Sequence, residues 1–428
     1  MNKIVLGFIM MMTTVVAKTQ NTTVVTLEDC LEYAYRQNYN LQSMELTEEA
    51  QEDAYRQSKM ERLPSLSASA SENLTHSAGS DASFGGSYGI SANMTLYQGG
   101  AIDNAIEQNK LRKEQSAYQT AQYTNTLTVQ ILQAFLTALG NEELLKYQAA
   151  VINASEENAR QGKAQYAAGS ILESDYLLLE AQLANDRNNV VNTQISRDNS
   201  LLTLKSLMAM PASTNLQILP PDTSAIRAME LLPAADEVIK QTLNVLPDLK
   251  ISQYNVDIAK VSLKMSKGNY LPTISLHGSI GTGHTEFDNF GTQLADRLNE
   301  QIGLSLSIPI YDNSRTKSKV TQSRIALQQA ELDKKQAELD AEQTVVTEYQ
   351  DVVSAYNKYK TNDIRQNAYS KTFDAYHAQF QAGSITAVNL LQQQNNYISA
   401  LNDYIQSKYE FMLKRKILDV YMGVKITM

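Results

Sequence analysis

The residues Ala168-Gly169-Ser170-Ile171 end a Pro-free stretch that begins at Tyr97, and the same four residues recur at 382–385, after a Pro-free stretch that begins at Tyr311. In both copies the Tyr and the Gly are 72 residues apart. Read as one helix of about 67 residues, each copy would be ~100 Å long at ~1.5 Å per residue. A helix of this length must span something much larger than a compact domain.

The segment before each long stretch is duplicated as well. The sequence predicts a helix from Leu27 to Glu61, with Thr26 as its N-cap, and another from Leu249 to Gly268. Arg62-Leu63-Pro64 and Tyr270-Leu271-Pro272 follow these helices, and each proline prevents the helix from continuing. The two Leu-Pro pairs therefore mark equivalent points in two copies of one unit.

A strand pattern follows each Leu-Pro pair. Over residues 64–97 and 271–311, apolar residues alternate with Ser, Gly and Asn on both sides of a polar loop. A period of two is typical of a β-strand with one apolar and one polar face. Each segment is predicted to be a β-hairpin, so that the chain supplies four strands.

Two long helices and two shorter return helices complete the pattern, and they are expected at residues 98–168, 170–210, 312–382 and 384–422. Gly169 suits the position just after a helix, where φ is positive. Ser170 and Glu173 have the spacing of a capping box for the first return helix.

Five of the eight prolines lie between Pro211 and Pro247. This Pro-rich segment, residues 211–247, is interpreted as an equatorial connector between two structural repeats, residues 18–210 and 248–428. A return helix of ~40 residues covers only ~60 Å of the descent. The leading helix of the same repeat has the length to complete it, so each repeat is predicted to be one long helix beside two short ones laid end to end.

The N-terminus has the features of an export signal. Lys3 is followed by the apolar run from Ile4 to Val16, and Val15-Val16-Ala17 offers small residues for cleavage. Residues 1–17 are therefore predicted to be a signal peptide. Cys30 is the single cysteine, which fits an exported chain without disulfides. It is expected to be a partly buried helix residue rather than a lipid anchor.

Composition argues against several classes of function. The formal net charge is −9 and no basic patch occurs, so no nucleic-acid partner is expected. The four histidines lack the spacing of a metal site, and no glycine-rich segment has the strand-and-helix context of a phosphate-binding loop. The chain is predicted to be no enzyme and to hold neither cofactor nor metal.

Four amphipathic strands of about ten residues are long enough to cross a membrane when tilted. Within lipid, a sheet must close without free edges, and four strands are too few to close by themselves. The chain is therefore expected to form a homotrimer. The predicted fold is mainly α with a small antiparallel β part: duplicated helical hairpins form a trimeric α-barrel, and four strands per chain contribute to a 12-stranded transmembrane β-barrel.

With these features the chain resembles the TolC-like outer-membrane efflux proteins. The resemblance rests on the duplicated order of elements, on the Leu-Pro strand starts and on a tip motif: an aromatic residue, a Gly three residues later and an Asp six beyond it. The motif residues here are Tyr166, Gly169, Asp175, Phe380, Gly383 and Asn389. The resemblance implies a trimer in the outer membrane, with its hairpin loops at the cell surface and its helical tunnel in the periplasm. It also implies a gate at the tips that opens when a periplasmic adaptor and an inner-membrane pump dock.

The resemblance assigns candidate residues at the tips. Those expected at the gate or constriction are Tyr166, Asp175, Phe380, Asn389 and Gln392, and those expected at the adaptor-docking turns are Gly169, Ser170, Gly383 and Ser384. Asn389 and Gln392 stand where the family carries carboxylates, and amides attract cations only weakly. Asp175 matches the motif, either as an acidic ring or as a carboxylate that stabilises its helix N-terminus. For Tyr166 and Phe380, packing is favoured over lining the constriction.

Three functions fit the sequence. The first is the exit duct of a tripartite efflux pump for drugs or other small molecules. The second is the exit channel of a type I protein secretion system, which the sequence does not distinguish from the first because the pump selects the cargo. The third is a surface coiled coil or adhesin stalk without a pore, since coiled-coil periodicity by itself favours such a stalk.

Overall fold

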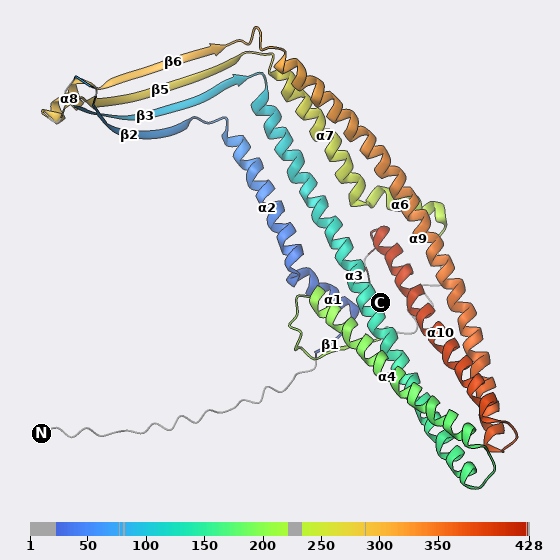
Figure 1. The fold of residues 1–428 in the computed structure, drawn as a ribbon. Coiled ribbons are helices and arrows are strands. Elements are labelled where there is room, and N and C mark those ends of the chain that lie inside the picture. Colours follow the sequence, from blue (N-terminus) through green and yellow to red (C-terminus); the bar gives the residue numbers. More distant parts are fainter. Residues whose placement is uncertain are drawn as a thin grey trace, which may run out of the picture.

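The computed structural model describes residues 23–76, 78–79, 82–220, 233–286, 288–424 and 426. The expected signal peptide, residues 1–17, lies outside the described residues, as does part of the connector, residues 221–232. The chain forms a long, bent molecule with a sheet at one end and two helical tips at the other (Figure 1).

The first repeat comprises β1 (Thr23–Val25), α1 (Leu27–Gln37), α2 (Tyr39–Met60), β2 (Ser65–Thr75), β3 (Ser83–Gln98), α3 (Ala101–Ala167) and α4 (Glu173–Leu207). Between the repeats lie β4 (Leu216–Ile218) and α6 (Ala235–Val245). The second repeat comprises α7 (Pro247–Gly268), β5 (Thr273–His284), α8 (Phe290–Asp296), β6 (Asn299–Ser307), α9 (Arg315–Gln381) and α10 (Ala387–Tyr421). The prediction of a mainly helical chain with a small antiparallel sheet is confirmed.

The four long strands form one antiparallel sheet in the order β2-β3-β5-β6. Figure 1 shows them side by side, with α8 near their far ends. The expected alternation is present: Leu66 pairs with Ala92, and the next pair, Ser67 and Ser91, joins its hydroxyls at 2.8 Å on the other face. Strands β2 and β6 are the sheet edges.

Each long helix packs against several shorter ones. Helix α3 contacts α2, α4, α7 and α10, and α9 contacts α6, α7 and α10. Both long helices have 67 residues and both return helices have 35. Leu132, Leu136 and Leu139 of α3 are buried in the core. Over the described residues, no helix has the length and apolar character that crossing a membrane requires.

Two local expectations were wrong. The leading helix is divided at Asn38, whose Oδ1 accepts the N–H of Leu41 at 3.0 Å and starts a new helix. Asparagine competes with the helical backbone in this way, although neither Gly nor Pro is present. The Ser170–Glu173 capping box is absent: the N-cap of α4 is Leu172, without a side-chain cap. The N–H of Ser170 instead donates to the carbonyl of Gln165 at 2.8 Å, so Ser170 belongs to the preceding turn.

Small elements complete the middle of the molecule. Strand β1 pairs in parallel with β4, so the start of the described chain is joined to the connector. Helix α6 lies within the Pro-rich segment and contacts α9. None of these three elements was predicted, because each is short and its contacts are with residues distant in the sequence.

Candidate functional site: the helical tips

The two tip turns have the same backbone. Gly169 and Gly383 have φ of 72° and 71°, which confirms the expected left-handed conformation at Gly169. In each turn the glycine N–H donates to an aromatic residue's carbonyl at 2.9 Å, and the following serine N–H donates to the residue before that aromatic. These two bonds satisfy carbonyls at the end of a helix and reverse the chain sharply.

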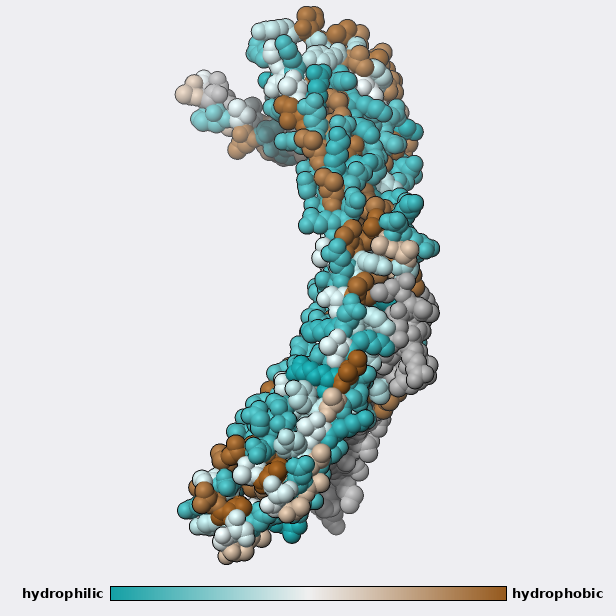
Figure 2. Space-filling view, turned by 90° about the vertical axis from the view of Figure 1, so that its right-hand side faces the viewer, coloured by the Kyte–Doolittle hydropathy of each residue, from teal (hydrophilic) through white to brown (hydrophobic). Residues whose placement is uncertain are grey.

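A cleft of about 550 Å³ separates the two turns. Both turns and the first residues of both return helices line it. Among the candidate residues, those in the cleft wall are Gly169, Ser170, Asp175, Gly383, Ser384 and Asn389. Figure 2 shows the tips at the lower end of the molecule, where hydrophobic side chains interrupt the hydrophilic surface. The structure therefore brings all four docking candidates and two of the gate candidates together.

The charges of the two cleft walls differ. Helix α4 carries Glu173 and Asp175 in its first turn, whereas the first turn of α10 carries no acidic residue. There the cap is a hydroxyl, because Thr386 Oγ1 accepts the N–H of Asn389 at 3.4 Å. The carboxylates of α4 lie where the positive end of a helix dipole favours them. In one chain, negative charge is thus confined to the first-repeat side.

The two aromatic candidates have different surroundings. Phe380 is only 1% exposed and packs in a cluster with Ala159, Leu179, Phe373, Ala387 and Leu390. Tyr166 is 40% exposed, and its ring stacks on Tyr176 at 5.8 Å between centroids. Within a single chain Phe380 is therefore a core residue, and Tyr166 remains accessible.

Gln392 lies away from the cleft. It is exposed on α10 beyond Asn389, and its Nε2 donates to Asn396 Oδ1 at 3.3 Å. The structure does not bring Gln392, Tyr166 or Phe380 into the cleft wall.

A buried polar network, not predicted from the sequence, lies above the tips. Asp186 of α4 accepts hydrogen bonds from Ser155 Oγ of α3 at 2.6 Å, from Gln394 Nε2 of α10 at 3.0 Å and from Gln182 at 2.8 Å. Burial raises the pKa of the Asp186 carboxyl above its ordinary value. The signal in the sequence is an acid on the apolar side of a helix, which is rare unless the acid is paired.

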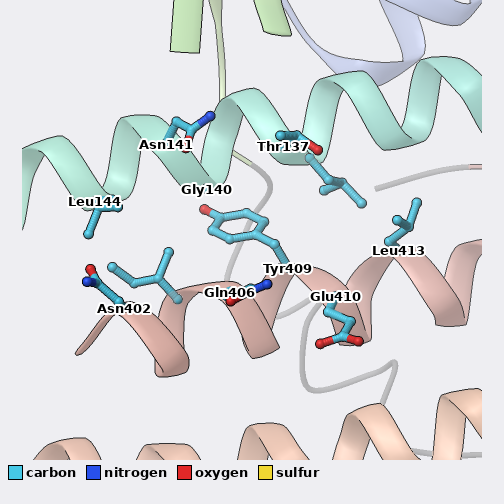
Figure 3. A pocket seen from close by; sticks show the side chains of 11 residues that line it. Thr137, Gly140, Asn141, Leu144, Asn402, Gln406, Tyr409, Glu410 and Leu413 are labelled. Carbon is cyan, nitrogen blue, oxygen red and sulfur yellow. The ribbon is translucent and has the colours of Figure 1, made fainter. Parts of the chain in front are cut away.

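A second cleft, of about 430 Å³, lies higher up between α3 and α10. Figure 3 shows the Tyr409 ring against the helix at Gly140, where a Cβ would lie 3.2 Å from the ring. Glu143 accepts hydrogen bonds from the Tyr409 hydroxyl and from Lys408 Nζ, both at 2.7 Å. This contact joins the first repeat to the second, so its evident role is structural.

The described residues hold no group of three or more His, Cys, Asp or Glu that could bind a metal. Cys30 is fully buried in α1, and burial raises the pKa of its thiol to about 12. A thiol of this kind is unreactive at neutral pH.

Comparison with known proteins identifies the family. The family model for outer membrane efflux proteins matches residues 31–210 and 238–424. The alkaline protease secretion protein AprF of Pseudomonas aeruginosa is 22% identical over 299 residues, covering 70% of this chain and 61% of AprF. The outer membrane efflux protein BepC of Brucella suis is 22% identical over 399 residues, covering 91% of this chain and 83% of BepC.

The crystal structure of the CmeC outer membrane channel of Campylobacter jejuni superposes with a TM-score of 0.76 at 15% identity, over 93% of this chain and 85% of CmeC. At this identity the likeness establishes the fold. The family predicted from the duplicated helices and the tip motif is confirmed: the chain belongs to the outer membrane efflux protein family.

Proposed function

We propose that three copies of this chain form a passive exit duct through the outer membrane, with the helical tunnel in the periplasm. The observation that carries the proposal is the sheet. Its apolar face is exposed in the single chain, through residues such as Leu66, Ile302 and Leu304, and the outer edges of β2 and β6 are unpaired in the described part of the chain. Such a sheet is stable in lipid only when it closes with other copies into a barrel.

The helices give the duct its length. Two helices of 67 residues descend from the sheet, and each rises ~100 Å at ~1.5 Å per residue. Their buried residues pack against the shorter helices. A closed ring of such helices encloses a tunnel that continues the barrel.

The tips are the proposed gate and docking site. Asp175 and Asn389 lie at the cleft between the turns, and Gln392 and Tyr166 are exposed nearby. Phe380 supports the gate from within the core. The turns at Gly169-Ser170 and Gly383-Ser384 are the proposed contacts for a periplasmic adaptor, because they form the exposed end of both hairpins. The driving force would come from an inner-membrane pump coupled through this adaptor.

The main candidate cargo is a drug or another small molecule, in keeping with efflux, the role that the name of BepC gives for that relative. Protein secretion is the second candidate, because AprF is described as an alkaline protease secretion protein. Both relatives are 22% identical to this chain, although the match to BepC covers more of it, 91% against 70%. The adhesin stalk, by contrast, leaves the exposed apolar sheet without a function.

The proposal is tested with the purified full-length protein in planar lipid bilayers. A duct gives stepwise conductance, and a stalk leaves the bilayer silent. For the cargo, the gene is deleted in its host, and both drug susceptibility and the proteins of the culture medium are compared with those of the complemented strain. Increased susceptibility indicates efflux, loss of a secreted protein indicates secretion, and a silent bilayer with neither change contradicts the proposal.

A further inference from the structure

The two hairpins are copies in register, not only in order. Adding 208 to the residue numbers of β2 and 214 to those of β3 converts the pairs of the first hairpin into those of the second: Ser65–Asn93 becomes Thr273–Ser307, and Asn73–Gly85 becomes Gly281–Asn299. Strand β5 is therefore the equivalent of β2, and β6 is the equivalent of β3.

The two hairpins pair with each other through β3 and β5, but the equivalent strands β6 and β2 do not pair with each other in the single chain. Strand β3 pairs with β5 inside the chain, whereas their equivalents, β6 and β2, are the two edges of the sheet. If the repeat continues around a ring, β6 meets β2 of the next copy just as β3 meets β5. The register of the internal contact then fixes the register of the seam.

We infer that β6 pairs antiparallel with β2 of a second copy of this chain, with Ser305 opposite Ser71 of the partner subunit. This deepens the proposed trimer by naming its β-sheet contact. The internal equivalent is the pair Ser91–Ser279. The same shift places Leu306 opposite Ala70 of the partner subunit, from the internal pair Ala92–Gly278.

The side chains of this register are complementary. Serine meets serine on the polar face, and leucine meets alanine on the apolar face. At the loop end Glu300 faces His76 of the partner subunit. The same two groups already meet inside the chain, where His284 Nε2 lies 3.1 Å from both carboxylate oxygens of Glu72. A slip of one residue would instead move serines onto the apolar face.

The backbone beyond β6 supports the same register. In β3 the pairing shifts between Thr95 and Tyr97, which indicates a bulge. The equivalent of Thr95 is Pro309, and proline is tolerated at bulges because it has no N–H to donate. Further along, Gly99 and Gly100 have positive φ, and so do their equivalents Asn313 and Ser314, at 53° and 62°.

Strand β6 nevertheless ends at Ser307 in the single chain, whereas β3 continues to Gln98. The residues that should continue it, Ile310 and Tyr311, are 95% and 83% exposed. The missing strand partner accounts for both observations. In the seam we expect β6 to extend as far as Tyr311, opposite Leu66 of the partner subunit.

Disulfide cross-linking tests the register. In a Cys30→Ala background, Ser305→Cys with Ser71→Cys is oxidised with Cu(II)–phenanthroline and oxygen, and analysed on non-reducing gels. Residues directly opposite have Cα atoms ~4.5–5.5 Å apart, within disulfide range. We expect the monomer band to weaken and a ladder of disulfide-linked dimers and trimers to appear. Leu306→Cys with Ala70→Cys serves as a second in-register pair. Hydrogen-bonded and non-hydrogen-bonded pairs alternate along antiparallel strands, so the two cysteine pairs sample both kinds.

Two slipped pairs are the matched controls: Ser305→Cys with Ser69→Cys, and Ser305→Cys with Asn73→Cys. Their diagonal separation is ~7–8 Å, which a disulfide spans poorly. Ser91→Cys with Ser279→Cys is the internal reference and should lose its free thiols without forming a ladder.

The inference is overturned if a slipped pair gives dimers and trimers, or if either single cysteine, at 71 or 305, gives disulfide-linked dimers. It is also overturned if the protein is trimeric and no pair cross-links. In both cases the proposed duct is judged separately, by native mass and bilayer conductance of the same variants under reducing conditions.

Discussion

Asn389 is one of the residues by which the two return helices differ in charge at the tips. Asn389 lies at the cleft on α10, where α4 presents Asp175. An amide has hydrogen-bonding capacity but no net charge, so a ring of three Asn389 side chains should attract cations weakly. Charge at this point is therefore the property by which a substitution can test the proposed gate.

Asn389→Asp should increase the cation selectivity of the channel. The new carboxylate would lie in the first turn of α10, where the helix dipole favours it, so folding should be unaffected. The measurement is the reversal potential in a salt gradient across a planar bilayer, which should shift toward the cation equilibrium potential. Asn389→Ser, which adds no charge, is the control, and an unchanged reversal potential in Asn389→Asp would remove Asn389 from the pore lining.

The sequence predicts the backbone conformation of the tip turns but not the burial of their aromatic residues. The left-handed turn at Gly169 follows from the residue type, because only glycine adopts that φ without strain. The different burial of Tyr166 and Phe380 does not follow from a motif that gives both the same position. Phe380 is buried by Phe373 and Leu390, residues of its own repeat, together with Leu179 of the other. Tertiary packing within and between the repeats determined this difference, and periodicity does not specify it.

At the scale of elements, Asp186 connects three helices. Its carboxylate accepts from Ser155 on α3 and from Gln394 on α10, so it ties the tip hairpin of one repeat to the return helix of the other. Burial makes the charged form unfavourable and raises the pKa, even though these hydrogen bonds act in the opposite direction. The network therefore gives specificity of packing at some expense in stability.

This balance predicts a pH dependence. Because the folded-state pKa of Asp186 lies above its ordinary value of 3.8, the folded chain binds the proton more tightly than the unfolded chain. The contribution of Asp186 to stability is thus fully present below pH 3.8 and is lost as the pH rises through the raised pKa. As the pH rises from 3.8 through the raised pKa, the melting temperature of the wild type should fall relative to that of Asp186→Asn. Thermal unfolding followed by circular dichroism at a series of pH values measures this difference.

Asp198→Asn is the matched control, because the Asp198 side chain lies on the same helix and is 62% exposed. Its stability should follow the wild type across the interval. Parallel curves for the wild type and Asp186→Asn would mean that the carboxylate is solvated in the assembled protein.

The helices and strands were predictable where the hydrophobic pattern repeats over many residues and a proline marks its end. Helices α3 and α9, and the four long strands, repeat their pattern over many residues, and Pro64 and Pro272 mark the same transition in each repeat. The break at Asn38 was missed because its cause is a side-chain hydrogen bond to Leu41, reinforced by another from Nδ2 to the Leu207 carbonyl at 2.8 Å. Leu207 is distant in sequence, so this contact is visible only in the fold.

At the scale of the whole molecule, the helices of the two repeats have equal lengths. The long helices have 67 residues each and the return helices 35 each, although their sequences differ. Both turns therefore reach the same level, where they share one cleft. In a ring of three chains this equality would give six tips in one plane, which is the arrangement that a docking adaptor requires.

Shortening one repeat should therefore abolish the duct, and shortening both should restore it. Deleting one heptad from α3 and one at the same level from α4 keeps the apolar stripes in phase but raises one tip by ~10 Å. We expect this variant to lose transport in the complemented deletion strain. Deleting matching heptads from α9 and α10 as well returns all tips to one plane and should recover it. The Ser305–Ser71 cross-link reports assembly in both variants, because the sheet is distant from the deletions. Equal transport by the one-repeat and two-repeat deletions would show that the adaptor recognises a single hairpin and does not need coplanar tips.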